Sequence, residues 1–238
     1  MKTIKSNKSG HLKTAWLLLV LAIPFSSFAK DNTLTDDEKS QGWTLLFNGK
    51  DMSQWRNFKK HDINEKWQVN NGVMQLTGAG GGDILTHDIY QNFDLRLEWK
   101  IANAGNSGIF ILADETGNQI YSHAIEIQIL DNKRHADNKI DSHLSGSIYD
   151  MIASPVESRR PAGLWNQVRI LLNQKQLTVW QNNIQTADIK IGGEQWQDLV
   201  AKSKFKDWQG FAKANIGHIG LQDHGDKVSF KNIKIKAL

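Results

Sequence analysis

Short apolar runs separated by turn residues dominate the chain from residue 41 onward. In residues 93–99 the odd-numbered positions are apolar and the even-numbered ones are charged, an alternation typical of a half-solvated strand. The predicted strands cover residues 43–47, 67–69, 73–76, 93–101, 107–112, 125–130, 168–172, 177–180, 218–221 and 228–235. Many short strands with turn residues between them indicate an all-β antiparallel sandwich or jelly roll.

Turn chemistry supports a chain of hairpins. Asn48-Gly49 and Asn70-Asn71-Gly72 favour hairpin turns because Asn and Gly accept positive φ, and Asn182-Asn183 favours one less strongly. Residues 194–209 mix apolar residues with lysines and predict one short amphipathic helix. No linker or repeat interrupts residues 41–238, which we expect to form a single domain.

The segment before this domain has two parts. Residues 1–29 carry four lysines, then an apolar run, then Ser27-Phe28-Ala29, a small-x-small pattern that predicts a cleaved secretory signal peptide. The apolar run is too short to span a bilayer comfortably, and without a cysteine no lipid anchor can be attached. We therefore expect a periplasmic or extracellular protein with no membrane contact after cleavage. Residues 30–40 predict a loose arm or a short capped helical turn.

The net charge of the chain depends on whether the predicted leader is counted. The full chain has 29 Lys and Arg against 25 Asp and Glu, and the four lysines of residues 1–29 account for the whole excess. A neutral remainder gives no support for nucleic-acid binding, which needs a basic face. Zero cysteines in an exported chain mean that stability depends on a hydrophobic core rather than on disulfides.

Polar residues interrupt the apolar strand at residues 125–130. Glu126 and Gln128 share one face of this strand, while three isoleucines occupy the other face. Asp131 would face away from them unless a bulge turns it back, and it also suits the turn that ends the strand. Core-facing isoleucines would thus hold a carboxylate and an amide on the exposed side, which is how a ligand-binding sheet face is built. An alternative is that Glu126 is simply a solvated surface carboxylate.

Residues 218–224 form the second candidate strand for a site. Its His218, Gln222 and His224 share one face, and they could converge with Glu126 if the two strands are neighbours. His224 could also be an ordinary loop histidine bonded to backbone. The Gly- and Asn-rich bend at residues 103–108 could present Asn106 to a ligand or be an ordinary connection.

Several histidines lie near the central strand in sequence. His123, His135 and His143, together with Glu126 and Asp131, could make a site for a divalent cation, although their spacing matches no metal motif. The nine tryptophans suggest sugar stacking, but most are expected to serve packing.

A set of motifs in a fixed order resembles the 3-keto-disaccharide hydrolase domain family. The motifs are Gly42-Trp43 through Asp51 with Trp55, Gly105-Asn106-Ser107-Gly108-Ile109, Glu126 through Asn132, Ser145-Gly146 through Asp150, Trp165-Asn166, Ser203-Lys204-Phe205, Ile216 through Gly225, and Phe230 through Ile233. The resemblance spans residues 41–238 and implies a concanavalin A-like jelly roll. It departs from the family after Ile109, where an arginine often follows, so a charged contact to the substrate is either missing or supplied by Arg134, Arg159 or Arg160.

The resemblance also implies a chemistry. A ketone at C3 of a glycoside acidifies the C2 hydrogen, so a base can form an enolate, the C1 substituent can leave, and water can add. We expect Glu126 and His224 to be the acid and base in an unassigned order, with Gln128, Asn106 or a bound divalent cation stabilising the enolate. Asp131, Tyr149 and Gln222 are further expected substrate contacts. An upstream sugar oxidoreductase would make the 3-keto-glycoside.

Two other functions stay open at this point. Glu126-x-Gln128-x-x-Asp131 has the spacing of the acidic strand in laminarinase-like retaining glycosidases, although Gln in the middle and the shorter Asp at the end count against that class. Jelly rolls also serve as noncatalytic carbohydrate-binding modules.

Overall fold

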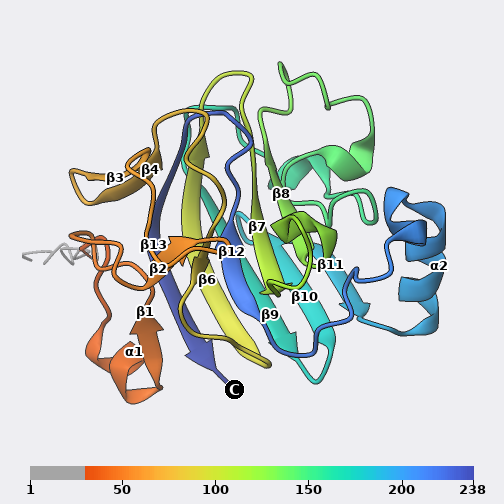
Figure 1. The fold of residues 1–238 in the computed structure, drawn as a ribbon, viewed down its shortest axis with the longest axis horizontal. Helices are drawn as coiled ribbons and strands as arrows, with labels where there is room; N and C mark the ends of the chain where they lie inside the picture. The colour runs from red at the N-terminus through yellow and green to blue at the C-terminus, as the bar shows by residue number, and fades with distance from the viewer. Residues whose placement is uncertain (1–29) are drawn as a thin grey trace, which may run out of the picture.

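Two antiparallel sheets stack face to face in the computed structural model, which describes residues 30–238 (Figure 1). The eight-stranded sheet runs in the order β11 (Ile184–Lys190), β10 (Gln176–Gln181), β9 (Asn166–Asn173), β6 (Phe93–Ile101), β13 (Val228–Ala237), β4 (Val73–Leu76) and β3 (Trp67–Asn70), with β1 (Trp43–Leu45) also paired to β13. The five-stranded sheet runs in the order β2 (Trp55–Asn57), β5 (Ile84–Thr86), β12 (His218–Leu221), β7 (Asn106–Ala113) and β8 (Ile125–Leu130).

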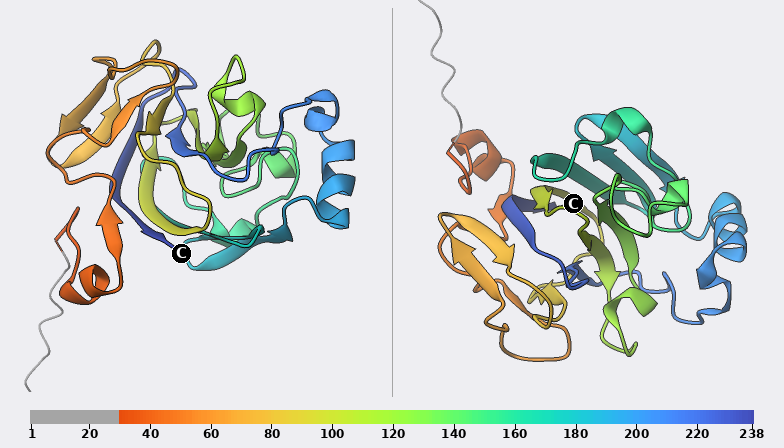
Figure 2. Two further views of the ribbon diagram at one scale, coloured as in Figure 1. Left: turned by 60° about the horizontal axis from the view of Figure 1, so that its bottom comes forward. Right: turned by 90° about the horizontal axis from the view of Figure 1, so that it is seen from above.

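Helices are few and peripheral in the described part of the chain. They are α1 (Asp36–Ser40), α2 (Glu194–Lys202) and the short 3₁₀ turns Ile120–Ser122, Asp141–His143, Val156–Ser158 and Lys204–Asp207. A capping box between Thr35 and Glu38 starts α1, so the capped-turn alternative for this segment is the observed one. Helix α2 stands at the edge of the sandwich in all three ribbon views (Figure 2). Within residues 30–238 no helix has both the length and the apolar character needed to cross a bilayer.

The core lies between the sheets because the alternation within strands sorts their faces. Ile125, Ile127 and Ile129 of β8 are fully buried in the main hydrophobic cluster, together with Trp99 of β6 and Phe230 of β13. The outer face of the small sheet carries a second, smaller apolar cluster around Leu85 and Phe110. The rest of that outer face is where the polar residues of β8 lie.

Every run predicted as a strand contains one, and the all-β sandwich is confirmed. Three short or polar strands, β2, β5 and β11, were not predicted. The helix predicted for residues 194–209 divides at Ser203 into α2 and a 3₁₀ turn, because the Ser203 hydroxyl accepts from the Phe205 amide and starts a new cap. The predicted leader, residues 1–29, lies outside the described residues.

Strand order changes one expectation. Glu126 and His224 could converge if the strands of residues 125–130 and 218–221 were neighbours, but β7 lies between β8 and β12, and His224 lies in the loop after β12. Strand β8 is the edge of its sheet, and its free side is extended by the loop that follows it, through a bridge between Ile127 and Ile148. This loop, residues 131–160, rises beside β8 at the upper right of Figure 1. It covers the face that was expected to be exposed.

Candidate active site

Glu126 lies on the outer face of β8 with its side chain almost closed off from solvent. Its side chain passes over Gly108 on the neighbouring β7. Glycine has no Cβ atom, and one added at this position would lie only 2.9 Å from Cδ of the Glu126 carboxyl group. On its other side, the bridge at Ile127 places Tyr149 opposite Glu126, and the Tyr149 amide donates to the Glu126 carbonyl at 3.0 Å. The residue is 8% exposed. The carboxyl group therefore lies against the backbone of β7 and is largely removed from solvent.

Burial controls the acidity of this carboxyl group. Removal from water raises the pKa of Glu126 to about 8, the ammonium of Lys204 opposes the rise, and the carboxylates of Asp83 and Asp137 add to it. The pKa of Lys204 is shifted as well: burial lowers it, and the carboxyl groups of Glu126 and Asp150 oppose the fall. A carboxyl group whose pKa lies near neutrality is suited to taking or giving a proton during turnover.

Lys204 reaches the site from the turn after α2. Its Nζ atom lies 4.1 Å from the centroid of the Tyr149 ring and 5.3 Å from that of Phe205, so aromatic faces hold the ammonium in place. Its backbone amide donates to Asp150 at 2.7 Å, which ties the turn to the loop after β8. The ammonium is thus fixed near Glu126 without a direct salt bridge to it.

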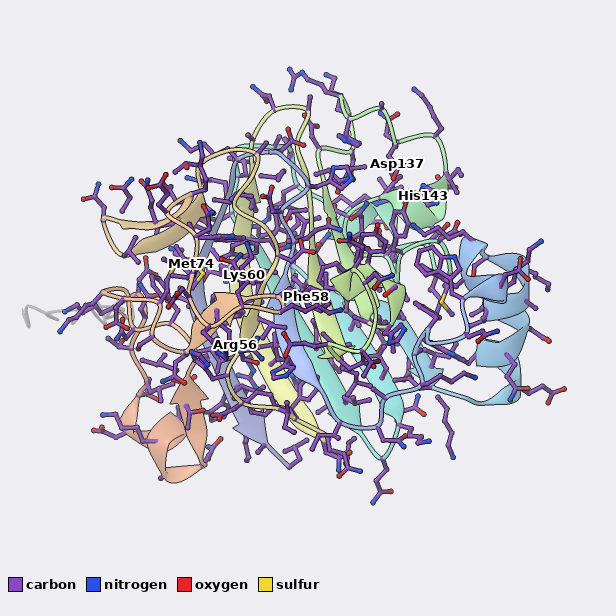
Figure 3. All side chains as sticks on the ribbon, in the orientation of Figure 1. Arg56, Phe58, Lys60, Met74, Asp137 and His143 are labelled. Atoms are coloured by element: carbon purple, nitrogen blue, oxygen red, sulfur yellow. The ribbon has the colours of Figure 1, made fainter. Side chains whose placement is uncertain are left out.

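A hydrogen-bonded chain holds the loop over the site. His143 bonds Asp137 through Nδ1 at 2.7 Å and Asp150 through Nε2 at 2.9 Å, and Asp137 also accepts from the Tyr149 hydroxyl at 2.9 Å. The His143 ring stacks on Tyr149 with centroids 4.4 Å apart. Figure 3 labels Asp137 and His143 in this loop, close to one another beside the end of β8. The chain joins the backbone of Lys204 to the ring of Tyr149.

The other polar residues of the β8 segment have separate environments. Gln128 is buried two residues along from Glu126, and its backbone pairs with the 145–149 loop. Asp131 follows a regular pairing of β7 with β8, with no bulge to turn it back. Its two carboxylate oxygens accept from the backbone amides of Ala104 and Lys133. Asp131 therefore organises the two loops at this end of the sheet.

His224 lies in the loop after β12, beside a histidine of the loop after β8. It is exposed and packs edge to face on His135, with ring centroids 5.9 Å apart, and Asp226 completes a cluster with them. Of the histidines expected to share a metal site, only His135 belongs to this cluster. His143 is engaged by two carboxylates, and His123 bonds Asp114. The expected grouping of all three with Glu126 is not what the described structure forms.

Two amides near this end of the sheet are buried without a full set of partners. The side-chain oxygens of Asn106 and Gln222 have no hydrogen-bond partner among residues 30–238. Such groups are uncommon in native proteins and mark places where something else binds or where the amide reorients. Both had been predicted as substrate contacts.

A large cavity elsewhere in the molecule has different chemistry. It measures about 930 Å³, lies against α2, and includes Lys175, Lys190, Lys206 and Lys213 in its wall. No carboxylate or histidine lines it, so it offers no group for proton transfer near neutral pH. The candidate site is assigned by its chemistry rather than by cavity size.

Sequence reasoning missed Lys204, Asp83 and Asp137 as members of the site. Lys204 was noticed only inside a motif, and nothing near it in sequence indicates that its ammonium reaches β8. The arginines proposed to supply a charge are bonded elsewhere: Arg134 to Asn103, Arg159 to Ser154 and Arg160 to the Trp165 carbonyl. The cation beside Glu126 is a lysine instead.

Comparison with known proteins identifies the group to which this arrangement belongs. The model of the 3-keto-alpha-glucoside-1,2-lyase-like domain family matches residues 42–236. The chain belongs to this family. A 3-keto-disaccharide hydrolase of Bacteroides thetaiotaomicron is 35% identical to it over 230 residues, which cover 84% of this chain and 79% of the relative. The chain is accordingly a carbohydrate-active enzyme of the hydrolase or lyase type.

Solved structures agree with the fold and with a carbohydrate-active role for the chain. A candidate glycosyl hydrolase from Parabacteroides distasonis superposes with a TM-score of 0.82 and 32% identity, covering 88% of this chain and all (100%) of that one. A second one from the same organism gives a TM-score of 0.66 and 26% identity over 82% and 99% of the two chains. A Bacillus subtilis protein with a galectin-like fold, 8% identical with a TM-score of 0.52 over 87% and 94% of the two chains, matches in fold alone. The predicted jelly-roll class is confirmed.

Proposed function

We propose that the protein cleaves 3-keto-glycosides by removing the C2 proton, eliminating the C1 substituent and adding water to the resulting enone. The observation that carries this proposal is Glu126, a carboxyl group with its pKa raised to about 8 near the ammonium of Lys204. A retaining glycosidase would need a second carboxylate as its partner, and Asp131 is occupied by backbone amides. A base with a nearby cation suits enolate chemistry better.

Glu126 is the general base in this proposal. Its carboxylate takes the proton from C2, and the electron pair forms the enolate of the C3 ketone. The Lys204 ammonium, held over Tyr149, stabilises the negative charge that develops on the ketone oxygen. Collapse of the enolate breaks the bond from C1 to the leaving oxygen, which takes up a proton. Water then adds across C1 and C2, its hydroxyl to C1 and its proton to C2, and the free 3-keto sugar results.

The buried amides of Asn106 and Gln222 support a polar ligand on the same face. Each has an oxygen without a partner among the described residues, and sugar hydroxyls are donors of the kind that such oxygens accept. Tyr149 stands opposite Glu126, and His143 and Lys204 both pack against its ring, so Tyr149 as a direct substrate contact stays a prediction. His224 as a second proton-transfer group stays a prediction.

The origin of the substrate follows from its oxidation state. A ketone at C3 arises by oxidation of a sugar hydroxyl, so an oxidoreductase must act before this enzyme. We propose that both steps serve the use of exported or external glycosides, in keeping with the predicted leader at residues 1–29.

The test compares an oxidised sugar with its parent. Purified protein is incubated with a 3-keto-glucoside and with the same glucoside before oxidation, and release of the aglycone is measured. We expect cleavage of the 3-keto compound only, because only its C2 hydrogen is acidified. Cleavage of the parent glucoside at a comparable rate would show a glycosidase instead. Binding of either sugar without turnover would show a noncatalytic binding module.

Gly108 provides a steric test of the base. An Ala at this position would bring Cβ within 3.0 Å of Cγ and 2.9 Å of Cδ in Glu126, so the carboxyl group must move. We expect Gly108→Ala to lower kcat/KM on the 3-keto-glucoside by about tenfold or more, since small displacements of a catalytic group are costly. The measurement is steady-state kinetics beside a thermal unfolding curve.

The matched control is Gly220→Ala on β12 of the same sheet. Its added Cβ would meet Ile120 Cδ1 at 2.6 Å, so it overpacks the sheet without touching Glu126. We expect this variant to lose stability while keeping kcat/KM. Equal activity losses in the two variants would mean that sheet overpacking, not the carboxyl position, is responsible.

A further inference from the structure

A cluster of metal-ligating side chains lies at one end of the small sheet, where the loops after β8 and β12 meet. It consists of His135, His224 and Asp226, whose ligand atoms all lie within 4.8 Å of one another. His135 belongs to the loop after β8, and the other two belong to the loop that leads from β12 into β13. Residues far apart in sequence are thus brought to one point.

Backbone contacts hold two of the three residues in position. The Asp226 carboxylate accepts from the Asn106 amide at 3.0 Å, which fixes it to the first residue of β7. The His135 amide donates to the Asp131 carbonyl at 3.1 Å, and the Asp131 side chain in turn organises that loop. His224 is exposed, so its ring can reorient. The cluster combines two anchored ligands with one adjustable ligand.

A second observation at the same place indicates a missing partner. Asn106, whose backbone amide holds Asp226, is 4% exposed and has a side-chain oxygen without a hydrogen-bond partner among residues 30–238. Amide oxygens are metal ligands and also accept from metal-bound water. The unpaired oxygen therefore belongs to the residue that positions the carboxylate of the cluster.

We propose that His135, His224 and Asp226 bind a divalent transition-metal ion of the zinc type. Imidazole nitrogens suit Zn²⁺ and its first-row neighbours, whereas Mg²⁺ and Ca²⁺ prefer all-oxygen sites. Around an ion with bonds of about 2.1 Å, ligand atoms stand about 3.4 Å apart, so the cluster closes inward when the ion binds. Three protein ligands leave coordination positions open to a ligand.

One hydrogen bond at His135 must change when the ion binds. The Asp137 amide donates to His135 Nδ1 at 3.1 Å. Coordination through Nδ1 replaces this hydrogen bond with a metal bond, and coordination through Nε2 places the ring hydrogen on Nδ1, which then repels the amide. Either way the amide of Asp137 loses its acceptor, and its NMR signal reports the event.

The position of the cluster indicates what a bound ion would do in catalysis, and this step rests on the proposed function. Asn106 and Gly108 are two residues apart on β7 and share a face, and Glu126 lies over Gly108. An ion held beside Asn106 is therefore next along the face from the base. Its open positions would take adjacent oxygens of the sugar, including the ketone oxygen that becomes the enolate oxygen.

The experiment measures metal binding without substrate. Protein without a polyhistidine tag is stripped with a chelator and titrated with Zn²⁺ by calorimetry, and bound zinc is counted by elemental analysis. We expect one tightly bound zinc per chain, a shift of the Asp137 amide signal, and at least about a tenfold loss of affinity in His135→Gln and in His224→Gln. Thermal unfolding of each variant checks that it is folded, and Asp226→Asn provides a third, nearly isosteric variant.

The control variants are His61→Gln and His87→Gln, which change exposed histidines outside the cluster. Both should bind zinc as the unaltered protein does. The site is overturned if the His135 and His224 variants bind zinc as tightly as these controls. Cleavage assays with and without zinc separate the two proposals: zinc binding without cleavage of either sugar refutes the function only, and cleavage by protein that binds no zinc refutes the site only.

Discussion

Replacing Glu126 by Gln is expected to lower kcat/KM on a 3-keto-glucoside by about a thousandfold. The amide keeps the size of the carboxyl group and its place over Gly108, but it cannot take the C2 proton. The residual activity would come from Lys204 and from binding alone. Steady-state kinetics on the purified variant, with circular dichroism to confirm the fold, measures the effect.

The control for this loss is Glu65→Gln, which makes the same chemical change at an exposed carboxylate outside the site. It should leave kcat/KM unchanged. If Glu126→Gln keeps more than about a tenth of the activity, the residue is not the general base.

The cation can be tested through the base. A general base with a pKa of about 8 predicts that kcat/KM rises with pH toward that value. In the free enzyme the Lys204 ammonium lowers the Glu126 pKa, against the effect of burial. Lys204→Met, which keeps most of the side-chain volume, should move this limb to higher pH as well as lowering the plateau. A limb that falls as pH rises would make Glu126 the acid and overturn the assignment.

Local signals were enough for the fold and for part of the site. The strict alternation in residues 93–99 indicates a strand, and Asn-Gly pairs indicate hairpin turns; each signal is complete within a few residues, so most strands could be predicted. Glu126 could be found because a carboxylate between isoleucines has no local reason to be there. The short strand β5 has no comparable pattern, since burial on both faces removes the alternation.

The remainder of the site depends on contacts that no local pattern encodes. Lys204 reaches Tyr149 only because α2 is capped at Ser203, beside the loop after β8. Asp137 lies in the site only because its bond to His143 draws that loop together. The loop after β8 also explains the largest difference from expectation. Glu126 was expected on an exposed face, and the loop that hides it is what raises its pKa.

This buried carboxyl group should also make stability depend on pH. In the unfolded chain the pKa of Glu126 returns to 4.5, whereas in the folded protein it is about 8. Between these values the folded state holds the proton and the unfolded state has released it. The free energy of unfolding therefore falls as pH rises through this window, by about 1.4 kcal/mol per pH unit from this group. Below and above the window the contribution is flat.

Glu126→Gln removes this term because the amide does not titrate. The variant should match the unaltered protein near about pH 4.5 and become the more stable of the two by a few kcal/mol near about pH 9. Asp83, with its pKa raised to about 6 by burial, contributes to both proteins and cancels in the difference. Urea unfolding across this pH range gives the two curves. Parallel curves would mean that Glu126 is ionised throughout, and a carboxylate already ionised in the resting enzyme could not be the group whose titration sets the rising limb of kcat/KM.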